Sequence, residues 1–173
     1  FFANVYDQNY LRVSKQIAKG GKNNVGADLK NFVKTMVSFD EGQTWAYARP
    51  PSHNNKNVPY DCEGCSLNLH LSDNPSYPPL YGVSSAPGIL VAVGSVGHYL
   101  SYAADDLAVF LSEDGGLSWR HVADGQHIYE IGDQGGLIVM SEYRKVTDTI
   151  KFTYDLGRSW FFVKFLDPSM AKD

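Results

Sequence analysis

The sequence has 173 residues, a formal net charge of −4 at pH 7 and 43% hydrophobic residues. A chain of this length can bury a globular core, and its mildly acidic charge argues against nucleic acid or an anionic membrane as a partner of the whole surface. Abundant tyrosine, phenylalanine and glycine, with few helix-length amphipathic patterns and no run long enough to cross a bilayer, favour an all-β fold.

In chain order, the pattern of apolar runs and turn residues predicts three groups of strands. The first group holds three strands and the other two hold four each. A polar loop is expected over residues 7–31, after the first strand. The predicted strands are 1–6, 32–39 and 45–48; then 66–71, 89–93, 107–112 and 118–122; then 127–131, 137–142, 149–153 and 160–165.

An eight-residue phrase of the form Ser/Thr-x-Asp-x-Gly-x-Ser/Thr-Trp occurs once in each group, at 38–45, 112–119 and 153–160. The hydroxyl and the carboxylate can bond free N–H groups of a tight turn, the glycine can supply a positive φ, and the indole can pack on the apolar layer behind. Each phrase therefore predicts a structural hairpin turn. Its key positions are Ser38, Asp40, Gly42 and Trp45; Ser112, Asp114, Gly116 and Trp119; Thr153, Asp155, Gly157 and Trp160.

Hairpins that recur at this period indicate a β-propeller or another repeat array. The distance from Asp114 to Asp155 is 41 residues, one ordinary four-stranded blade, whereas the 74 residues from Asp40 to Asp114 fit one blade with long insertions. We expect blades at about 1–50, 60–124 and 126–166. Because three blades are too few to close a ring, the chain is expected to be part of a larger propeller.

The phrase is the Asp box, or BNR repeat, known from sialidases and from VPS10 (sortilin-type) sorting receptors. The sequence between the boxes resembles the middle of a VPS10 domain, in order, over about residues 1–165. The segments that carry the resemblance are Phe2-Ala3-Asn4-Val5, 62–70, 86–97 and 132–139. The resemblance implies that residues 1–173 are part of a single ten-bladed VPS10 propeller.

The resemblance also implies a function. VPS10 domains form the lumenal or extracellular part of type I membrane receptors, which sort peptide or protein cargo, including vacuolar or lysosomal hydrolases, between Golgi, endosome and cell surface. We thus expect cargo, the rest of the propeller and a downstream transmembrane segment as partners. No catalysis, cofactor, metal, nucleic acid or membrane insertion by this segment is implied, and no ligand-contacting residue is carried over. The alternatives are an Asp-box glycoside hydrolase, such as a sialidase, and a non-catalytic scaffold propeller.

Cys62 and Cys65, the two cysteines, have three interpretations: a redox pair, half of a zinc site or a structural disulfide. A redox pair usually begins a helix, and here a strand is expected. Zinc would need further ligands, for which His53 and His70 are available without a recognised spacing. A structural disulfide is preferred, and VPS10 domains similarly pair two cysteines just before such a strand.

Other residues support weaker hypotheses. His70 alternates with Ser66 and Asn68 on the polar face of an expected strand, so it could line a central channel and act as a pH switch near pH 6. The segment 12–34 is basic and could contact an acidic ligand. The glycine-rich stretches 94–97 and 132–136 are expected to be turns. The remaining histidines are His53, His98, His121 and His127, and the five arginines are scattered in the sequence.

Overall fold

The computed structural model describes residues 1–8, 10, 32–72 and 76–165. The described chain is all-β and forms three antiparallel sheets. Within the described ranges, the short 3-10 helices η2 (Ala104–Asp106) and η3 (Asp133–Gly135) lie in loops between strands. The all-β class and the expected grouping of three, four and four strands are confirmed.

The first sheet has the order β1-β2-β3, with β1 at Phe2–Tyr6, β2 at Val33–Val37 and β3 at Ala46–Tyr47. Phe2 pairs with Val37, and Met36 pairs with Tyr47. Every second residue of β2 is buried, as a period of two requires for a strand with one covered face.

The second sheet has the order β4-β5-β6-β7, with β4 at Ser66–Leu69, β5 at Leu90–Gly97, β6 at Ala108–Ser112 and β7 at Arg120–Asp124. Both of its faces are covered, because all residues of β4 and β6 are buried. Strand β7 begins two residues later than expected, since Ser118 still belongs to the Asp-box turn and bonds the carboxylate of Asp114.

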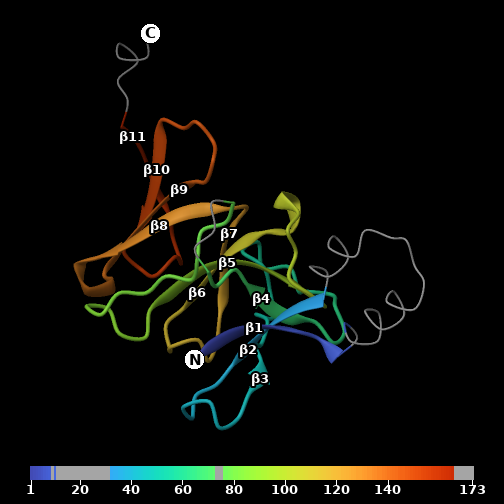
Figure 1. Cartoon of the computed structure of the whole chain (residues 1–173). Coiled ribbons are helices and arrows are strands. Elements are labelled where there is room, and N and C mark those ends of the chain that lie inside the picture. The colour runs from blue at the N-terminus through green and yellow to red at the C-terminus, as the bar shows by residue number, and fades with distance from the viewer. Residues whose placement is uncertain (9, 11–31, 73–75, 166–173) are drawn as a thin grey trace.

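The third sheet has the order β11-β10-β9-β8, with β8 at His127–Gly132, β9 at Leu137–Glu142, β10 at Thr149–Thr153 and β11 at Phe161–Lys164. Figure 1 shows the three sheets following one another across the molecule in chain order, from β1–β3 at the bottom to β8–β11 at the upper left. The sheets therefore form a row of sequential units.

One expectation about the second sheet was wrong. Residues 94–97 do not form a turn but continue β5, where Gly94 pairs with Leu69 and Gly97 pairs with Ser66. A Cβ at Gly94 would collide with the backbone carbonyl of Asn68. The glycine thus permits the close approach of β4 to β5, which a sequence pattern cannot distinguish from a turn. Residues 132–136 do form a turn, at η3.

Two apolar layers hold the row together, one on each face of the second sheet. The layer between the first and second sheets contains Leu67, Leu69, Ala92, Phe110 and Trp119. The layer between the second and third sheets contains Val91, Val93, Val109, Leu111, Val122, Ile131, Ile138 and Met140. Successive residues of β5 and β6 thus alternate between the two layers, which explains why both strands read as continuous apolar runs.

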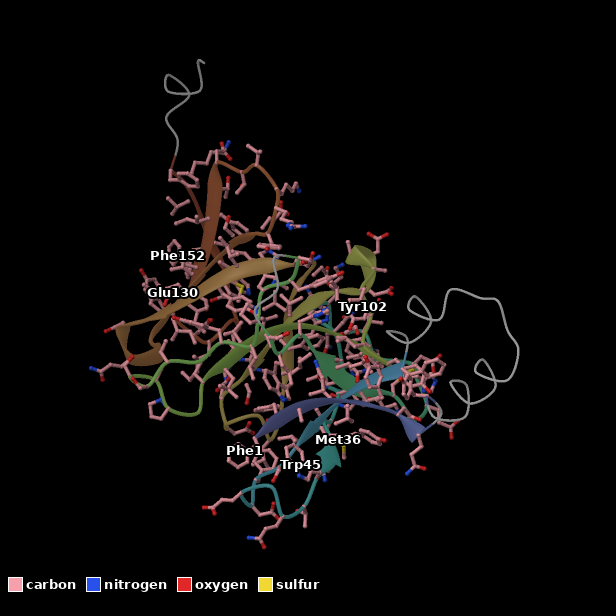
Figure 2. The ribbon with its side chains drawn as sticks, viewed as in Figure 1. Phe1, Met36, Trp45, Tyr102, Glu130 and Phe152 are labelled. Atoms are coloured by element: carbon pink, nitrogen blue, oxygen red, sulfur yellow. A yellow bond between two sulfur atoms is a disulfide. The ribbon has the colours of Figure 1, made fainter. Side chains whose placement is uncertain are left out.

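The exposure of the third residue after each box tryptophan shows which outer face of the row has no covering sheet. Ala48 is buried between the first and second sheets, and Val122 between the second and third. The equivalent Val163 is exposed, as are Phe161 and Ile128 on the same face of the third sheet. Trp45 and Phe152 lie at opposite ends of the row (Figure 2). An apolar face left open at the equivalent position is consistent with a segment of a larger propeller.

The packing at Gly116 yields a test of this arrangement. A Cβ at Gly116, at φ +97°, would collide with the ring of Phe2 from the first sheet, whereas neighbouring Gly115, at φ +71°, has open space around it. Gly115→Ala should lower the free energy of unfolding by about 1 kcal/mol through backbone strain alone. Gly116→Ala should cost at least about 2 kcal/mol, because overpacking adds to the strain. Urea unfolding of both variants measures the difference, and equal losses would contradict the packing of Phe2 on this turn.

Candidate functional site

The first Asp box is a turn closed by the carboxylate of Asp40. Oδ1 of Asp40 accepts hydrogen bonds from the backbone N–H of Thr44 and the hydroxyl of Ser38, each at 2.8 Å, and Oδ2 accepts from the hydroxyl of Thr44 at 2.6 Å. The backbone N–H of Gly42 donates to Oγ of Ser38 at 2.8 Å. Glu41 and Gly42 have positive φ angles of 60° and 89°. The roles expected for the hydroxyl, the carboxylate and the glycine are thus observed.

The other two boxes repeat this geometry. Oδ1 of Asp114 and of Asp155 accepts from the backbone N–H of Ser118 and of Ser159, in both cases at 2.9 Å. Gly116 and Gly157 donate their N–H groups to Ser112 at 2.8 Å and to Thr153 at 2.9 Å. These three aspartates are therefore used in local turns, as expected, and their carboxylates already accept several hydrogen bonds each.

These hydrogen bonds lower the pKa values of the box aspartates. For Asp40 the pKa falls to about 2, chiefly through the bond from the Thr44 side chain, and the pKa values of Asp114 and Asp155 also fall, chiefly through Ser118 and Ser159. A carboxyl group with a lowered pKa in the folded state stabilises the fold above its unfolded pKa. For Asp40 this contribution is present above about pH 4 and is lost as the pH falls through about 2.

The indoles of the boxes differ in their surroundings. Trp119 is 4% exposed and makes an edge contact with Phe2 of the first sheet, at 6.2 Å between ring centroids. Its Nε1 donates to Gly116 O at 3.1 Å, as Trp45 Nε1 donates to Gly42 O at 3.0 Å. Trp45 is 40% exposed. The second box thus packs under the preceding sheet, while the first box has no such cover among the described residues.

The polar face of β4 is in contact with the first sheet. Asn68 accepts from the N–H of Thr35 at 3.2 Å, and the hydroxyl of Thr35 accepts from the N–H of Leu69 at 2.8 Å. Asn4 Nδ2 donates to Leu69 O at 3.0 Å, which joins the first sheet to the second. Ser66 and Asn68 are buried as a result. Sequence alternation predicts which residues share a face but not what covers that face.

His70 is 6% exposed, and its ring stacks on Tyr77 at 4.1 Å between centroids. Its Nε2 lies 3.2 Å from the carbonyl oxygen of Ser101, and Tyr102 contacts the ring edge-on. Burial lowers the pKa of His70 to about 4, and the Ser101 carbonyl only partly offsets this effect. Burial thus opposes the expected titration of His70 near pH 6.

Cys62 and Cys65 form a disulfide just before β4, so the preferred interpretation of this pair is confirmed. The imidazole of His98 lies beside it, with one ligand atom of each of the three residues within 4.8 Å of the others. His53 and His70, the ligands considered from the sequence, are not in this cluster. Tyr60, two residues before this disulfide, reaches His121 of β7, with the hydroxyl 2.6 Å from Nδ1.

A groove of about 560 Å³ lies between the loop of residues 51–57 and the second and third boxes. Residues Pro51–Asn55 form one wall, and the other wall combines Trp119, Arg120 and His121 with Arg158 and Trp160 of the third box. An adjoining cavity of about 440 Å³ shares Asn54 and His121 with it and contains Asp105, Asp106 and Asp124. The groove is thus basic and aromatic, whereas the adjoining cavity is rich in acidic residues.

Two arginines that are distant in the sequence meet at this groove. Nη2 of Arg120 lies 2.5 Å from Glu113 Oε1, and Nη2 of Arg158 lies 3.1 Å from the same oxygen. The two ion pairs lower the pKa of Glu113, although partial burial opposes them as the largest single effect. Arg120 also donates to the carbonyl of Leu156 in the third box. Arg120 and Arg158 lie 38 positions apart in the sequence, and the stacking of the boxes on successive sheets brings them together.

The basic segment 12–34 falls almost entirely outside the described residues. Lys34 is described, and its ammonium lies 3.5 Å from Asp7 and 4.6 Å from the ring centroid of Tyr47. None of the helices in the described ranges is long and apolar enough to span a membrane.

The row of Asp-box sheets defines a segment of a β-propeller. A family model described as "Sortilin, neurotensin receptor 3" matches residues 9–173. The chain is 37% identical over 141 residues to a Vacuolar protein sorting/targeting protein 10 of Komagataella phaffii, which covers 77% of the chain. It is 38% identical to that of Lodderomyces elongisporus, over 78% of the chain, and 35% identical to that of Laccaria bicolor, over 83%.

The chain belongs to the Sortilin-Vps10 family, because the family model matches almost its whole length. The resemblance found in the sequence is thereby confirmed. The matched regions amount to 9%, 9% and 10% of the three relatives, so the chain spans about a tenth of their length.

Loss of the disulfide should lower the free energy of unfolding by a moderate amount. The bond joins residues only three positions apart, so it removes little chain entropy from the unfolded state. The double variant Cys62→Ser, Cys65→Ser should lower the free energy of unfolding by about 2 kcal/mol in denaturant titrations. Wild-type protein under reductant is the control and should lose a similar amount. Labelling of either cysteine by a thiol reagent without prior reduction would contradict the pairing.

The protonation of His70 can be followed by NMR. Its imidazole signals should not change between pH 7 and pH 5, whereas in urea they should titrate near pH 6.5. Because the pKa of His70 is lower in the folded state, its contribution to stability is complete above about pH 6.5 and falls as the pH drops toward 4. A midpoint near pH 6 in the folded protein would restore His70 as a switch.

Proposed function

We propose that this chain is part of the ligand-binding propeller of a sorting receptor that carries peptide or protein cargo between Golgi and endosomes. The observation that carries the proposal is the family match over residues 9–173. Its relatives are named for vacuolar protein sorting and targeting, so hydrolases bound for the vacuole or lysosome are the cargo class we propose.

In this proposal residues 1–173 lie within a single VPS10 propeller domain, with blades at about 1–50, 60–124 and 126–166. The rest of the propeller and a downstream transmembrane segment complete the receptor. The domain faces the lumen of Golgi and endosomes or the cell exterior, where the disulfide between Cys62 and Cys65 would be maintained. The exposed apolar face of the third sheet, with Phe161 and Val163, supports this arrangement because another blade would cover it.

The proposed role is binding without catalysis. The carboxylates of the three Asp boxes are occupied by hydrogen bonds from their own turns, which leaves them poorly suited to attack or protonate a substrate. Arg120 and Arg158 share the carboxylate of Glu113, so neither is presented as an unpaired ligand for a sugar acid. Cargo binding therefore explains these residues better than glycoside hydrolysis, the function of other Asp-box proteins.

The proposal is tested by capture of cargo from a secretory-pathway lysate. The full lumenal region that contains this chain is immobilised, and the proteins bound at pH 7 and released at pH 5 are identified by mass spectrometry. Hydrolase precursors or peptide precursors should bind at pH 7 and elute at pH 5. Unrelated lumenal protein on the same resin is the control.

The same preparation separates the alternatives. Turnover of a fluorogenic sialoside or glucoside, together with an empty capture, would replace the receptor with an Asp-box glycoside hydrolase. Neither turnover nor capture would indicate a scaffold propeller.

A further inference from the structure

The Cys62–Cys65 disulfide lies at an exposed turn that leads into β4. Residues 61–64 are exposed, and Cys65 is partly buried. Glu63 and Gly64 form the turn between the two cysteines, where Gly64 has a φ of 70°. An incoming thiol can therefore reach the bond at Cys62 while the second sheet stays folded.

The register of the second sheet places His98 beside this disulfide. Gly97, the last residue of β5, pairs with Ser66, the first residue of β4. The next residues along this antiparallel register are His98 and Cys65. Accordingly, one ring nitrogen of His98 and the two sulfurs all lie within 4.8 Å of one another. Asn68 Nδ2 donates to Gly97 O at 3.0 Å, which holds the end of β5 in this position.

His98 can provide the positive charge that a helix N-terminus provides in many redox pairs. The thiolate is the reactive form of such a pair, and a neighbouring imidazolium stabilises it. Asp61 and Glu63 adjoin Cys62 in the sequence, and their negative charges oppose a thiolate there. Protonated His98 offsets these charges, because its imidazole lies within reach of both sulfurs. Redox chemistry at this pair therefore does not require a helix.

The chain is anchored on both sides of the pair, so the cysteines stay close together when the bond is broken. Tyr60, two residues before Cys62, has its hydroxyl 2.6 Å from Nδ1 of His121 in β7. Cys65 is followed directly by the buried strand β4. Because the bond joins residues only three positions apart, its reduction should lower the free energy of unfolding only moderately. The folded chain can thus be reduced and oxidised again.

From this arrangement we propose that Cys62 and Cys65 form a redox-active pair, which exchanges its disulfide with the two thiols of a cysteine-bearing protein. A thiolate of the partner attacks Sγ of the exposed Cys62. A bond forms between these two sulfurs, the Cys62–Cys65 bond breaks, and the electron pair leaves on Sγ of Cys65. The imidazolium of His98 gives this sulfur a proton.

A second thiolate of the same partner completes the exchange. It attacks the partner's own sulfur in the mixed disulfide, forms a disulfide within the partner and releases the thiolate of Cys62, which takes a proton from solvent. Overall, the partner dithiol loses two electrons and two protons, and the Cys62–Cys65 pair gains them. This chemistry goes beyond the proposed function, and only the lumenal location of the partner rests on it.

The first experiment measures whether the pair equilibrates with glutathione. The full lumenal region that contains this chain is incubated at increasing ratios of reduced to oxidised glutathione, with a chelator that keeps metal ions off the reduced pair. Free thiols are then blocked with iodoacetamide and located by peptide mass spectrometry. Both cysteines should become reduced while circular dichroism shows a folded protein, whereas disulfides that only stabilise a fold resist reduction by glutathione.

Single variants identify the sulfur that is attacked. Cys65→Ser leaves the thiol of the exposed Cys62, and Cys62→Ser leaves that of the partly buried Cys65. The first variant should form a mixed disulfide with oxidised glutathione several times faster than the second, because reactivity follows exposure.

A pH profile tests the role of His98. In His98→Gln the reduced pair should react with oxidised glutathione about fivefold more slowly at pH 6, because the thiolate loses an adjacent positive charge. This difference should shrink as the pH rises and the wild-type imidazole loses its proton, which a merely structural role would not produce. His53→Gln is the matched control: it removes an exposed histidine outside the cluster and should leave the rate unchanged.

A wild-type pair that stays oxidised in reduced glutathione alone would overturn the proposal, whatever the variants do. Equal rates for the two cysteine variants would contradict attack at Cys62. A pH profile of His98→Gln that matches the wild-type profile would remove His98 from the mechanism. Because the probe is glutathione and not cargo, these outcomes leave the receptor function to be judged by the capture experiment.

Discussion

The hydrogen bonds that the carboxylate of each Asp box accepts hold the three turns around which the sheets are arranged. Each carboxylate fixes a turn in which two successive residues have positive φ, at Glu41 and Gly42 and again at Gly115 and Gly116. That turn ends one strand, begins the next and orients the following indole. The carboxylate accepts hydrogen bonds from the backbone N–H and the hydroxyl of this turn. Without them, packing alone would offset the free-energy cost of these backbone conformations.

The turns also link one sheet to the next. Phe2 of the first sheet packs on Gly116 and Trp119 of the second, and Val122 of the second packs on Gly157 of the third. Polar bonds supplement this packing where Asn68 and Thr35 join β4 to β2. Each sheet therefore covers the box of its successor, which is how a chain of repeats forms a continuous structure from nearest-neighbour contacts.

This arrangement places the possible functional sites at the margins of the sheets. The groove of Arg120 and Arg158 lies where two successive boxes meet the loop of residues 51–57. The Cys62–Cys65 pair lies with His98 at the turn that leads into β4. Function in such a repeat is carried by side chains at strand ends and loops, because the sheet interiors are occupied by packing.

Local patterns in the sequence predict the all-β class, the grouping of strands, the three turns and the family. A Ser-x-Asp-x-Gly phrase closes its own turn wherever it occurs. That Gly94 belongs to a strand, that His70 is buried and that Arg120 meets Arg158 is seen only in the folded chain. Those facts depend on which neighbour covers a face, and residues distant in the chain supply that neighbour.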